Sequence, residues 1–215
     1  MVALVVNADD FGHSEATNEG IARAREHGIV TSTSLMVRRP GAEHAARYAR
    51  ANPAFSVGLH IDFGPWEYPD GDRERVDESA PVSDEVAGQL ELFRELVGRD
   101  PTHIDSHHHV HRDDPVGPEA RATAAKLGVP LRFHGPARYM GEFYGLPKAD
   151  AIELPALLSI IDRLREGVSE LGCHPGLDAE LDSSYRLQRL REVEVLCDPS
   201  VRDALHRREV VLRTF

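Results

Sequence analysis

The chain has 215 residues, of which 41% are apolar and 28% are charged, and it carries a formal net charge of −11. The apolar share is ordinary for a globular protein, and α/β barrels commonly run to about 200–250 residues as one unit. We therefore expect a single domain over residues 1–215. The acidic balance disfavours nucleic acid and anionic membrane surfaces as partners, because both attract basic proteins.

The cysteine content and the N-terminus suggest a compartment. The chain has only two cysteines, Cys173 and Cys197, and so few in a chain of this size are typical of a reducing environment. The apolar run at residues 2–6 lacks a basic flank and leads directly into polar residues, which indicates a strand rather than a signal peptide. No stretch approaches the ~18 apolar residues of a membrane span. We expect a cytoplasmic protein.

Short apolar runs alternate with helical patterns along the whole chain. Strands are expected at residues 3–7, 31–37, 56–62, 103–106, 130–133, 168–173 and 209–213. Helices are expected at residues 14–26, 41–51, 84–97, 119–126, 155–165 and 185–196. Strands that alternate with helices and are apolar on both faces indicate a buried parallel sheet. The pattern predicts an α/β fold whose sheet resembles a barrel of about seven parallel strands, one fewer than the usual eight.

Capping residues mark several of the expected helix ends. Ser83 or Asp84 is expected to cap the third helix, and Ser183 or Ser184 the last one. Gly128 follows the fourth helix, in the position that a left-handed C-terminal glycine prefers.

Residues 62–81 are rich in Gly, Pro, Asp and Glu and predict a long irregular loop. Loops of this length are usually functional or disordered. Arg38 and Arg39 follow the second strand, and we interpret them as surface residues at the strand end.

Polar clusters lie at the carboxyl ends of four of the expected strands. They are the adjacent pair Asp9 and Asp10, then His60, the run beginning at His107, and His174. In a parallel α/β sheet or barrel, binding and catalytic sites form at the carboxyl ends of the strands. These side chains should therefore converge in space although they are far apart in sequence.

Asp9 and Asp10 are neighbours, so in a regular strand they would point to opposite faces. At a strand end the backbone can turn and bring both toward one pocket, where one carboxylate could bind a metal and the other act as a base. The alternative is that Asp10 or Ser14 only caps the first helix. The histidines at other strand ends weigh against this alternative for Asp10.

Histidine is concentrated in the segment from His107 to His111. We interpret His111 and His109 as residues of a solvated loop, and a lone histidine such as His60 is often a hydrogen-bonded core residue. One carboxylate with two imidazoles nevertheless forms a three-ligand site with open positions, which suits Zn²⁺ or another first-row metal. Water bound there reaches a pKa of roughly 7 and becomes a nucleophile at neutral pH.

Four further residues near these clusters have plainer interpretations. Asp62 is expected to be a solvated loop acid, while Cys173 and Cys197 are expected to pack as small buried side chains. Asp105 lies two residues before His107, on the same strand face. It is either a hydrogen-bond acceptor for a ligand imidazole or a buried carboxylate without that role.

The motifs together resemble those of one known family. The longest are NADDFG at residues 7–12 and THIDSHHHVH at residues 102–111, and both are specific. Shorter matches are TST at residues 31–33, GLH at 58–60 and HPG at 174–176. In this order they resemble the YdjC-like family of carbohydrate deacetylases, of the chito-oligosaccharide deacetylase type. The resemblance covers the chain from Val5 to its end, including the late segment 185–205.

The resemblance implies a distorted (β/α) barrel of the NodB-like polysaccharide deacetylase type and a divalent metal ion, zinc or magnesium. By position, Asp10, His60 and His107 match the family's metal ligands. Asp9 matches the general base, and His174 matches the general acid of related polysaccharide deacetylases.

Arg132 matches an arginine that orients the base, although its alternative is a surface residue on a strand. The chain departs from the family pattern between His60 and the fourth strand, over residues 62–100, where it is shorter than many relatives. This departure leaves the ligand set intact but makes the size and identity of the substrate uncertain.

The predicted function is removal of an N-acetyl group from an acetylated amino sugar or short oligosaccharide, with release of acetate. The expected partner is a small carbohydrate, and homodimer formation is left open.

One alternative is an amidohydrolase acting on a different amide, although such a barrel would be expected to open with a His-x-His pair. A non-haem iron oxygenase would have no need of the paired aspartate base. The remaining alternative is a metal- or sugar-binding protein on an inactive deacetylase scaffold, against which Asp9 and His174 argue. The sequence does not determine the sugar, the native metal or the role of His108.

Overall fold

The structure is a computed structural model that describes residues 1–63, 81–177 and 185–215. Its strands are β1 (Val2–Phe11), β2 (Ser32–Leu35), β3 (Ser56–Ile61), β4 (Ile104–Ser106), β5 (Arg138–Met140), β6 (Gly167–Cys173) and β7 (Val210–Leu212). Its α-helices are α1 (Glu15–Glu26), α2 (Ala42–Ala51), α3 (Val82–Val97), α4 (Val116–Leu127), α5 (Leu154–Asp162), α6 (Arg186–Leu196) and α7 (Pro199–Arg207). Two 3₁₀-helices are η1 (His107–Arg112) and η2 (Ala149–Ile152).

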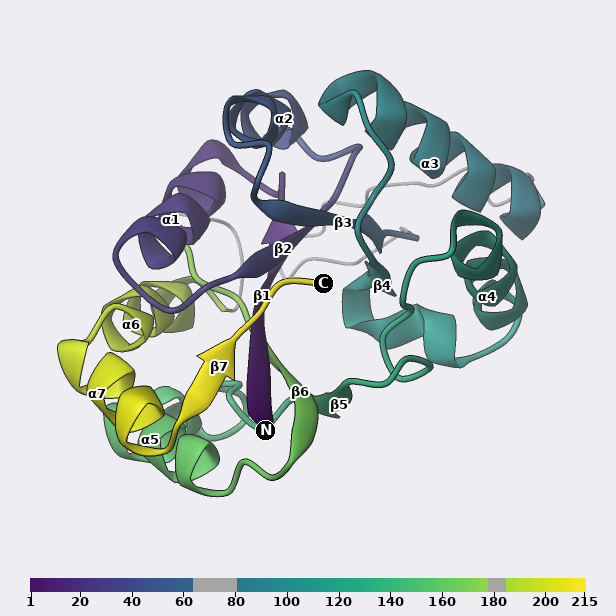
Figure 1. Ribbon diagram of the computed structural model, residues 1–215. Helices are drawn as coiled ribbons and strands as arrows, with labels where there is room; N and C mark the ends of the chain where they lie inside the picture. Colours follow the sequence, from purple (N-terminus) through teal and green to yellow (C-terminus); the bar gives the residue numbers. More distant parts are fainter. Residues whose placement is uncertain (64–80, 178–184) are drawn as a thin grey trace.

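The strands form one parallel sheet in the order β4-β3-β2-β1-β6-β5, and β7 pairs in parallel with β1. Helices are arranged around the outside of the strands (Figure 1). The sheet curves into a barrel that does not close, because β4 and β5 at its two edges are not paired. The predicted α/β barrel of about seven parallel strands is thus confirmed.

β1 is the central strand and positions the rest of the sheet. It pairs with β6 over residues 2–8, with β7 over residues 2–4 and with β2 from Asn7 onward. Nine of its ten residues are buried, as expected for a parallel strand that is covered on both faces. Its carboxyl end therefore lies at the centre of the edge where the strands terminate.

The strand predicted at residues 130–133 is not formed. Leu131 makes one isolated bridge with Ile104 of β4, and the backbone N–H of Arg132 donates to the carbonyl of Ile104. Phe133 then takes a φ of 67°, which ends any extended run because that region is unfavourable for an aromatic side chain. The pairing with β6 is supplied instead by β5, farther along the chain.

The predicted helix ends have mixed outcomes. Gly128 has a φ of 69° at the end of α4, which confirms its predicted role. The prediction for Ser83 or Asp84 is wrong, because α3 already begins at Val82 without a side-chain cap. Ser183, Ser184 and most of the predicted loop at residues 62–81 lie outside the described residues.

The sequence interpretation missed α7. Asp198 caps this helix by accepting a hydrogen bond from the backbone N–H of Ser200 at 2.8 Å, and Pro199 occupies its first position. An aspartate followed by proline is a known start signal for helices, so the sequence did contain the information. None of the described helices is both long and apolar enough to cross a membrane.

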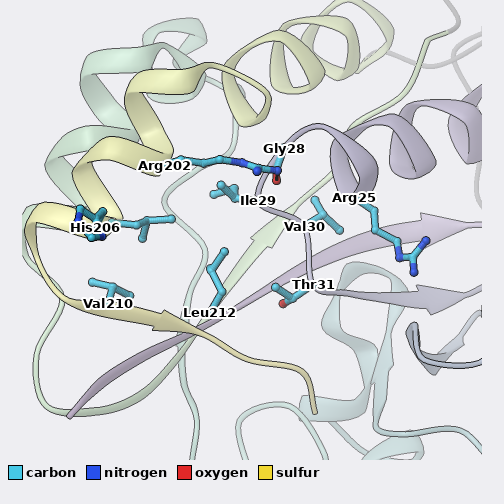
Figure 2. A pocket seen from close by; sticks show the side chains of 10 residues that line it. Arg25, Gly28, Ile29, Val30, Thr31, Arg202, His206, Val210 and Leu212 are labelled. Carbon is cyan, nitrogen blue, oxygen red and sulfur yellow. Dashed lines mark hydrogen bonds between the residues drawn. The ribbon is translucent and has the colours of Figure 1, made fainter.

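A hollow of about 450 Å³ opens at the amino-terminal end of the strands, opposite the carboxyl ends where the predicted site residues lie (Figure 2). It lies between the end of α1, helix α7 and β7, with Arg25, Arg202 and Leu212 among its lining residues. The guanidinium of Arg202 donates to the carbonyl of Gly28, and that of Arg25 donates to Tyr48 and Asn52. The guanidinium groups of Arg25 and Arg202 are thus hydrogen-bonded to other residues of the protein. None of the predicted site residues lines this hollow.

Candidate active site

The carboxyl ends of β1, β3, β4 and β6 bring the predicted polar clusters together. The pairing of β1 with β2 shifts register between Ala8 and Phe11, and Asp10 within this interval has a φ of 65°. Aspartate tolerates this left-handed conformation better than most residues, and such strain is concentrated at functional sites. The turn brings both Asp9 and Asp10 close to His60. Ser14, rather than Asp10, caps α1 by accepting from the N–H of Thr17.

Asp10, His60 and His107 lie around one point. Oδ1 of Asp10 is 3.4 Å from Nε2 of His60 and 3.1 Å from Nδ1 of His107. One ligand atom from each residue lies within 4.8 Å of the other two. Such spacing allows the three atoms to contact a single small cation, because ligand distances to zinc are about 2.0–2.2 Å.

The hydrogen bonds of His60 favour a metal at this point. Its Nδ1 lies 2.7 Å from Oδ1 of Asp105, and both side chains are buried. Its Nε2 is also buried and makes no hydrogen bond within the described part of the chain. A histidine that donates Nδ1–H to a carboxylate and leaves Nε2 open has the arrangement of a metal-ligating imidazole. The residues present therefore fit a divalent ion.

A second group, Asp9, His60 and Asp105, is equally compact but less suited to a cation. Arg132 contacts both carboxylates, with Nη2 at 2.7 Å from Oδ1 of Asp9 and at 2.8 Å from Oδ2 of Asp105. Ser34 also donates to Oδ2 of Asp105 at 2.9 Å. A cation placed among these groups would face a buried guanidinium.

Arg132 joins three buried carboxylates. Its guanidinium binds Asp9 through two hydrogen bonds of 2.6 and 2.7 Å, and its Nε donates to Glu170 at 2.7 Å. The residue is only 4% exposed, so its interpretation as a surface arginine is wrong. Burial and the neighbouring Asp105 act to raise the pKa of Asp9, but the charge and hydrogen bonds of Arg132, together with His60, lower it overall. Asp9 is consequently an oriented carboxylate that stays ionised.

Asn7 and Ser34 support the same carboxylates and were not identified from the sequence. The side-chain amide of Asn7 donates to Oδ1 of Asp9 at 2.8 Å and to Oγ of Ser34 at 3.2 Å. Asn7 lies two residues before Asp9 and hence on the same strand face, which is a signal that could have identified it.

His174 stands directly after β6, beside Asp9. Its Nε2 is 4.0 Å from Oδ2 of Asp9, and its side chain is 20% exposed. Burial lowers the pKa of His174 to about 4. The imidazole of His174 is therefore neutral at neutral pH.

Helix α6 supplies residues that the sequence interpretation assigned no role. Arg189 donates to Oδ2 of Asp10 at 2.6 Å, so only Oδ1 of that carboxylate faces the two histidines. Glu192 accepts from the backbone N–H of His174 at 2.5 Å and from the hydroxyl of Tyr185 at 2.6 Å. Burial raises the pKa of Glu192 to about 8. Charged residues occur all along α6, so its sequence pattern did not indicate which of them face the sheet.

The histidines that follow His107 have structural positions that differ from expectation. His111 is fully buried, with Nδ1 2.5 Å from Oγ of Ser106 and Nε2 3.2 Å from the carbonyl of Arg132. It therefore connects η1 to the segment that carries Arg132, and its interpretation as a solvated residue is wrong. His109 is half-buried against the ring of Phe133, so the same interpretation is also wrong for this residue.

Asp62 and Arg39 form a buried ion pair at the ends of β2 and β3. Nε and Nη2 of Arg39 each lie 2.7 Å from Oδ2 of Asp62. Asp62 is 9% exposed and Arg39 is 5% exposed, so the expectations of a solvated acid and a surface arginine are both wrong. Only Arg38 is exposed, and it pairs with Glu85.

Both cysteines are free thiols. Cys173 is completely buried and its Sγ donates to the carbonyl of Asn7 at 3.4 Å, which confirms its predicted packing role. Cys197, at the end of α6, is only partly buried.

Taken as chemistry, the site combines an open cation position with an oriented carboxylate and an imidazole on one side of it. This arrangement suits hydrolysis, since a carboxylate can accept the proton of an attacking water and an imidazole can protonate a leaving group.

Comparisons with known proteins identify the family of this chain. A model of the family described as "YdjC-like protein" matches residues 3–207. A carbohydrate deacetylase of Geobacillus stearothermophilus is 36% identical over 239 residues, covering 98% of this chain and 96% of the relative. A chitooligosaccharide deacetylase of Serratia marcescens is 34% identical over 250 residues, covering 99% of this chain and 97% of the relative.

Solved structures show the same fold. A crystal structure of the "putative cellobiose-phosphate cleavage protein" of Enterococcus faecalis has a TM-score of 0.84 and 28% identity, and covers 99% of this chain and 97% of that chain. A polysaccharide deacetylase of Bacillus cereus has a TM-score of 0.59 at 11% identity, covering 100% of this chain and 92% of that chain. The latter shows that the architecture is shared with polysaccharide deacetylases.

Proposed function

The chain belongs to the YdjC-like family, and from this premise we propose that it is a metal-dependent hydrolase that removes the N-acetyl group from an acetylated amino sugar or short oligosaccharide. The products are acetate and the free amine. The observation that carries the proposal is the buried Nε2 of His60, which makes no hydrogen bond to the described residues and lies 3.4 Å from Oδ1 of Asp10. The deacetylase names of relatives with 34–36% identity support the substrate class.

Asp10, His60 and His107 would hold the ion, and two imidazoles with one carboxylate favour zinc or another first-row metal over magnesium. When bound, such an ion supplies a Lewis acid and lowers the pKa of water to roughly 7. Arg189 keeps Oδ2 of Asp10 engaged and so fixes the direction in which Oδ1 points.

Asp9 acts as the general base. Arg132 and Asn7 hold its two oxygens in place, so little reorganisation is needed before the carboxylate accepts the proton of the attacking water. Attack on the acetamide carbon gives a tetrahedral intermediate, and the C–N bond then breaks.

His174 delivers a proton to the leaving amine. Because its imidazole starts neutral, it must first receive this proton, and Oδ2 of Asp9, 4.0 Å away, can supply it once Asp9 has accepted the proton of the water. The proton removed by Asp9 is thus the one that His174 passes to nitrogen, and the cycle needs no external acid.

We further propose that residues 1–215 act as one domain and, since both cysteines are free thiols, that the protein works in the cytoplasm.

The test is a measurement of acetate release by purified protein that has been stripped with a chelator and reloaded with zinc or magnesium. Substrates are N-acetylglucosamine and its short β-linked oligomers. We expect acetate release that depends on the metal. Bound metal without acetate release from any of these sugars would contradict the proposal, and sugar binding in that case would favour the inactive-scaffold alternative.

Two neighbouring histidines provide a matched pair of variants for the metal site. His107→Asn should lower metal stoichiometry measured by elemental analysis, because it removes a ligand. His108→Asn should retain the metal, because His108 is exposed and its φ of 50° is a conformation that asparagine tolerates well. Equal metal content in both variants would remove His107 from the ligand set.

A further inference from the structure

Two tyrosines form a flat stack directly beside His174. The rings of Tyr144 and Tyr185 have centroids 4.5 Å apart and planes within 6° of each other. The ring of His174 meets both at a steep angle, with centroid distances of 5.3 Å to Tyr144 and 5.7 Å to Tyr185. The stack is therefore part of the wall of the site, although neither tyrosine has a role in the proposed chemistry.

Only the outer member of the stack is open to solvent. Tyr185 is 4% exposed, whereas Tyr144 is 37% exposed. Since Tyr185 covers one face of the Tyr144 ring, the exposed area of Tyr144 belongs to its other face and edges. The protein thus presents a flat aromatic surface next to the imidazole.

The segment around Tyr144 holds this surface in a fixed position. Phe143, the preceding residue, is completely buried, and the backbone N–H of the following Gly145 donates to the hydroxyl of Tyr185 at 2.6 Å. That hydroxyl in turn donates to the buried carboxyl of Glu192 at 2.6 Å. Both neighbours of Tyr144 are therefore anchored, and its ring is oriented before any ligand arrives.

We propose that the exposed face of Tyr144 is a platform that binds the apolar face of a sugar ring. The platform thereby selects substrates that can place a pyranose ring beside His174. This inference rests on the proposed deacetylase function and deepens it. A pyranose ring has a face of C–H groups that is removed from water when it lies on an aromatic ring, while its hydroxyls remain solvated at the edges. A preformed platform contributes to affinity because little side-chain freedom is lost on binding.

The test compares binding in the Asp9→Asn background, in which turnover is expected to be slow, using metal-loaded protein and the β-linked disaccharide of N-acetylglucosamine. Isothermal titration should show that Tyr144→Ala raises the dissociation constant about tenfold, which corresponds to about 1.4 kcal/mol. Tyr144→Phe keeps the ring and should stay within about threefold of the parent. Leu212→Ala is the matched control, because Leu212 is 38% exposed but lies on β7 at the other end of the strands.

Kinetics in the otherwise unaltered protein separate a platform from a structural role. Tyr144→Ala should raise KM for the disaccharide with little change in kcat, because the residue contacts the sugar and not the reacting atoms. A fall in kcat with unchanged binding would instead mean that Tyr144 only positions His174, and it would overturn the proposal.

The outcomes also separate this inference from the proposed function. Equal affinity of Tyr144→Ala and its parent, together with acetate release by the unaltered protein, would overturn the platform alone. Failure of the unaltered protein to bind or deacetylate any of the sugars would overturn both. Loss of affinity in Tyr144→Ala and in Leu212→Ala alike would indicate general damage and would also refute the platform.

Discussion

Glu192→Gln should change the pH dependence of stability in a direction that follows from the burial of this carboxyl group. Burial raises the pKa of Glu192 to about 8 in the folded protein, compared with an ordinary value of 4.5. Between these two values the folded chain holds a proton that the unfolded chain releases, so stability falls as pH rises. The contribution is fully present below about pH 4.5 and is lost as the pH passes through about 8.

The magnitude follows from linkage at about 1.4 kcal/mol per pH unit for one group. Between about pH 5 and about pH 7.5, the free energy of unfolding of the wild type should fall by about 3 kcal/mol more than that of Glu192→Gln. For a chain of this size that difference corresponds to roughly 6–12 °C in Tm. Glutamine is a close mimic of the protonated side chain, since its carbonyl can accept from His174 N–H and its amide can donate to Tyr185.

The assay is thermal unfolding of both proteins across this pH range in the presence of a chelator, because metal binding has a pH dependence of its own. Other titrating groups are shared by the two proteins and cancel in the difference. Glu194→Gln is the control, since Glu194 lies on the same helix with a side chain that is 66% exposed. A Tm difference between wild type and Glu192→Gln that does not grow with pH would refute the reasoning.

Four further substitutions test the site. Asp9→Asn should keep the metal but lower kcat about 10²–10⁴-fold, whereas Asp10→Asn should lose the metal first; near-normal turnover of Asp9→Asn would assign the base elsewhere. Arg132→Met leaves three buried carboxylates without their cation and should lower the free energy of unfolding by about 3–5 kcal/mol in denaturant titrations. An unchanged midpoint would mean that those carboxylates are already protonated. His174→Ala should lower kcat on the amide about 10²–10⁴-fold and affect an activated ester much less, because the ester's leaving group needs no proton. Equal losses on the two substrates would remove His174 from proton transfer.

Motifs and strand ends were enough to predict which residues gather at the site. Each of these predicted residues lies in the last part of a buried strand or directly after it (Asp9, Asp10, His60, His107 and His174). Parallel strands terminate at a common edge. Their convergence therefore depends only on correct identification of strands. The same reasoning failed for His111, because burial of a polar residue depends on the partners that tertiary structure supplies.

Residues that hold the site in place could not be predicted in this way. Arg189 and Glu192 lie on α6, and Arg189 follows its partner Asp10 by more than 170 residues. A helix with charged residues along its whole length gives no sign of which side faces the sheet. Arg132 was expected near the base, but its simultaneous contact with Glu170 and Asp105 joins segments that are far apart in the sequence.

The sequence by itself determined most of the strands and helices, the parallel sheet and the set of candidate ligands, because hydrophobic periodicity and motif spacing are local properties. It did not determine β5 or α7. Tertiary structure alone decided which carboxylate binds Arg132, why His174 is neutral, and that Tyr144 stacks on Tyr185. Those features depend on distances between segments far apart in the sequence and on the burial of side chains. Burial shifts the pKa values and leaves one face of the Tyr144 ring exposed. Neither the distances nor the burial are encoded in any short stretch of the chain.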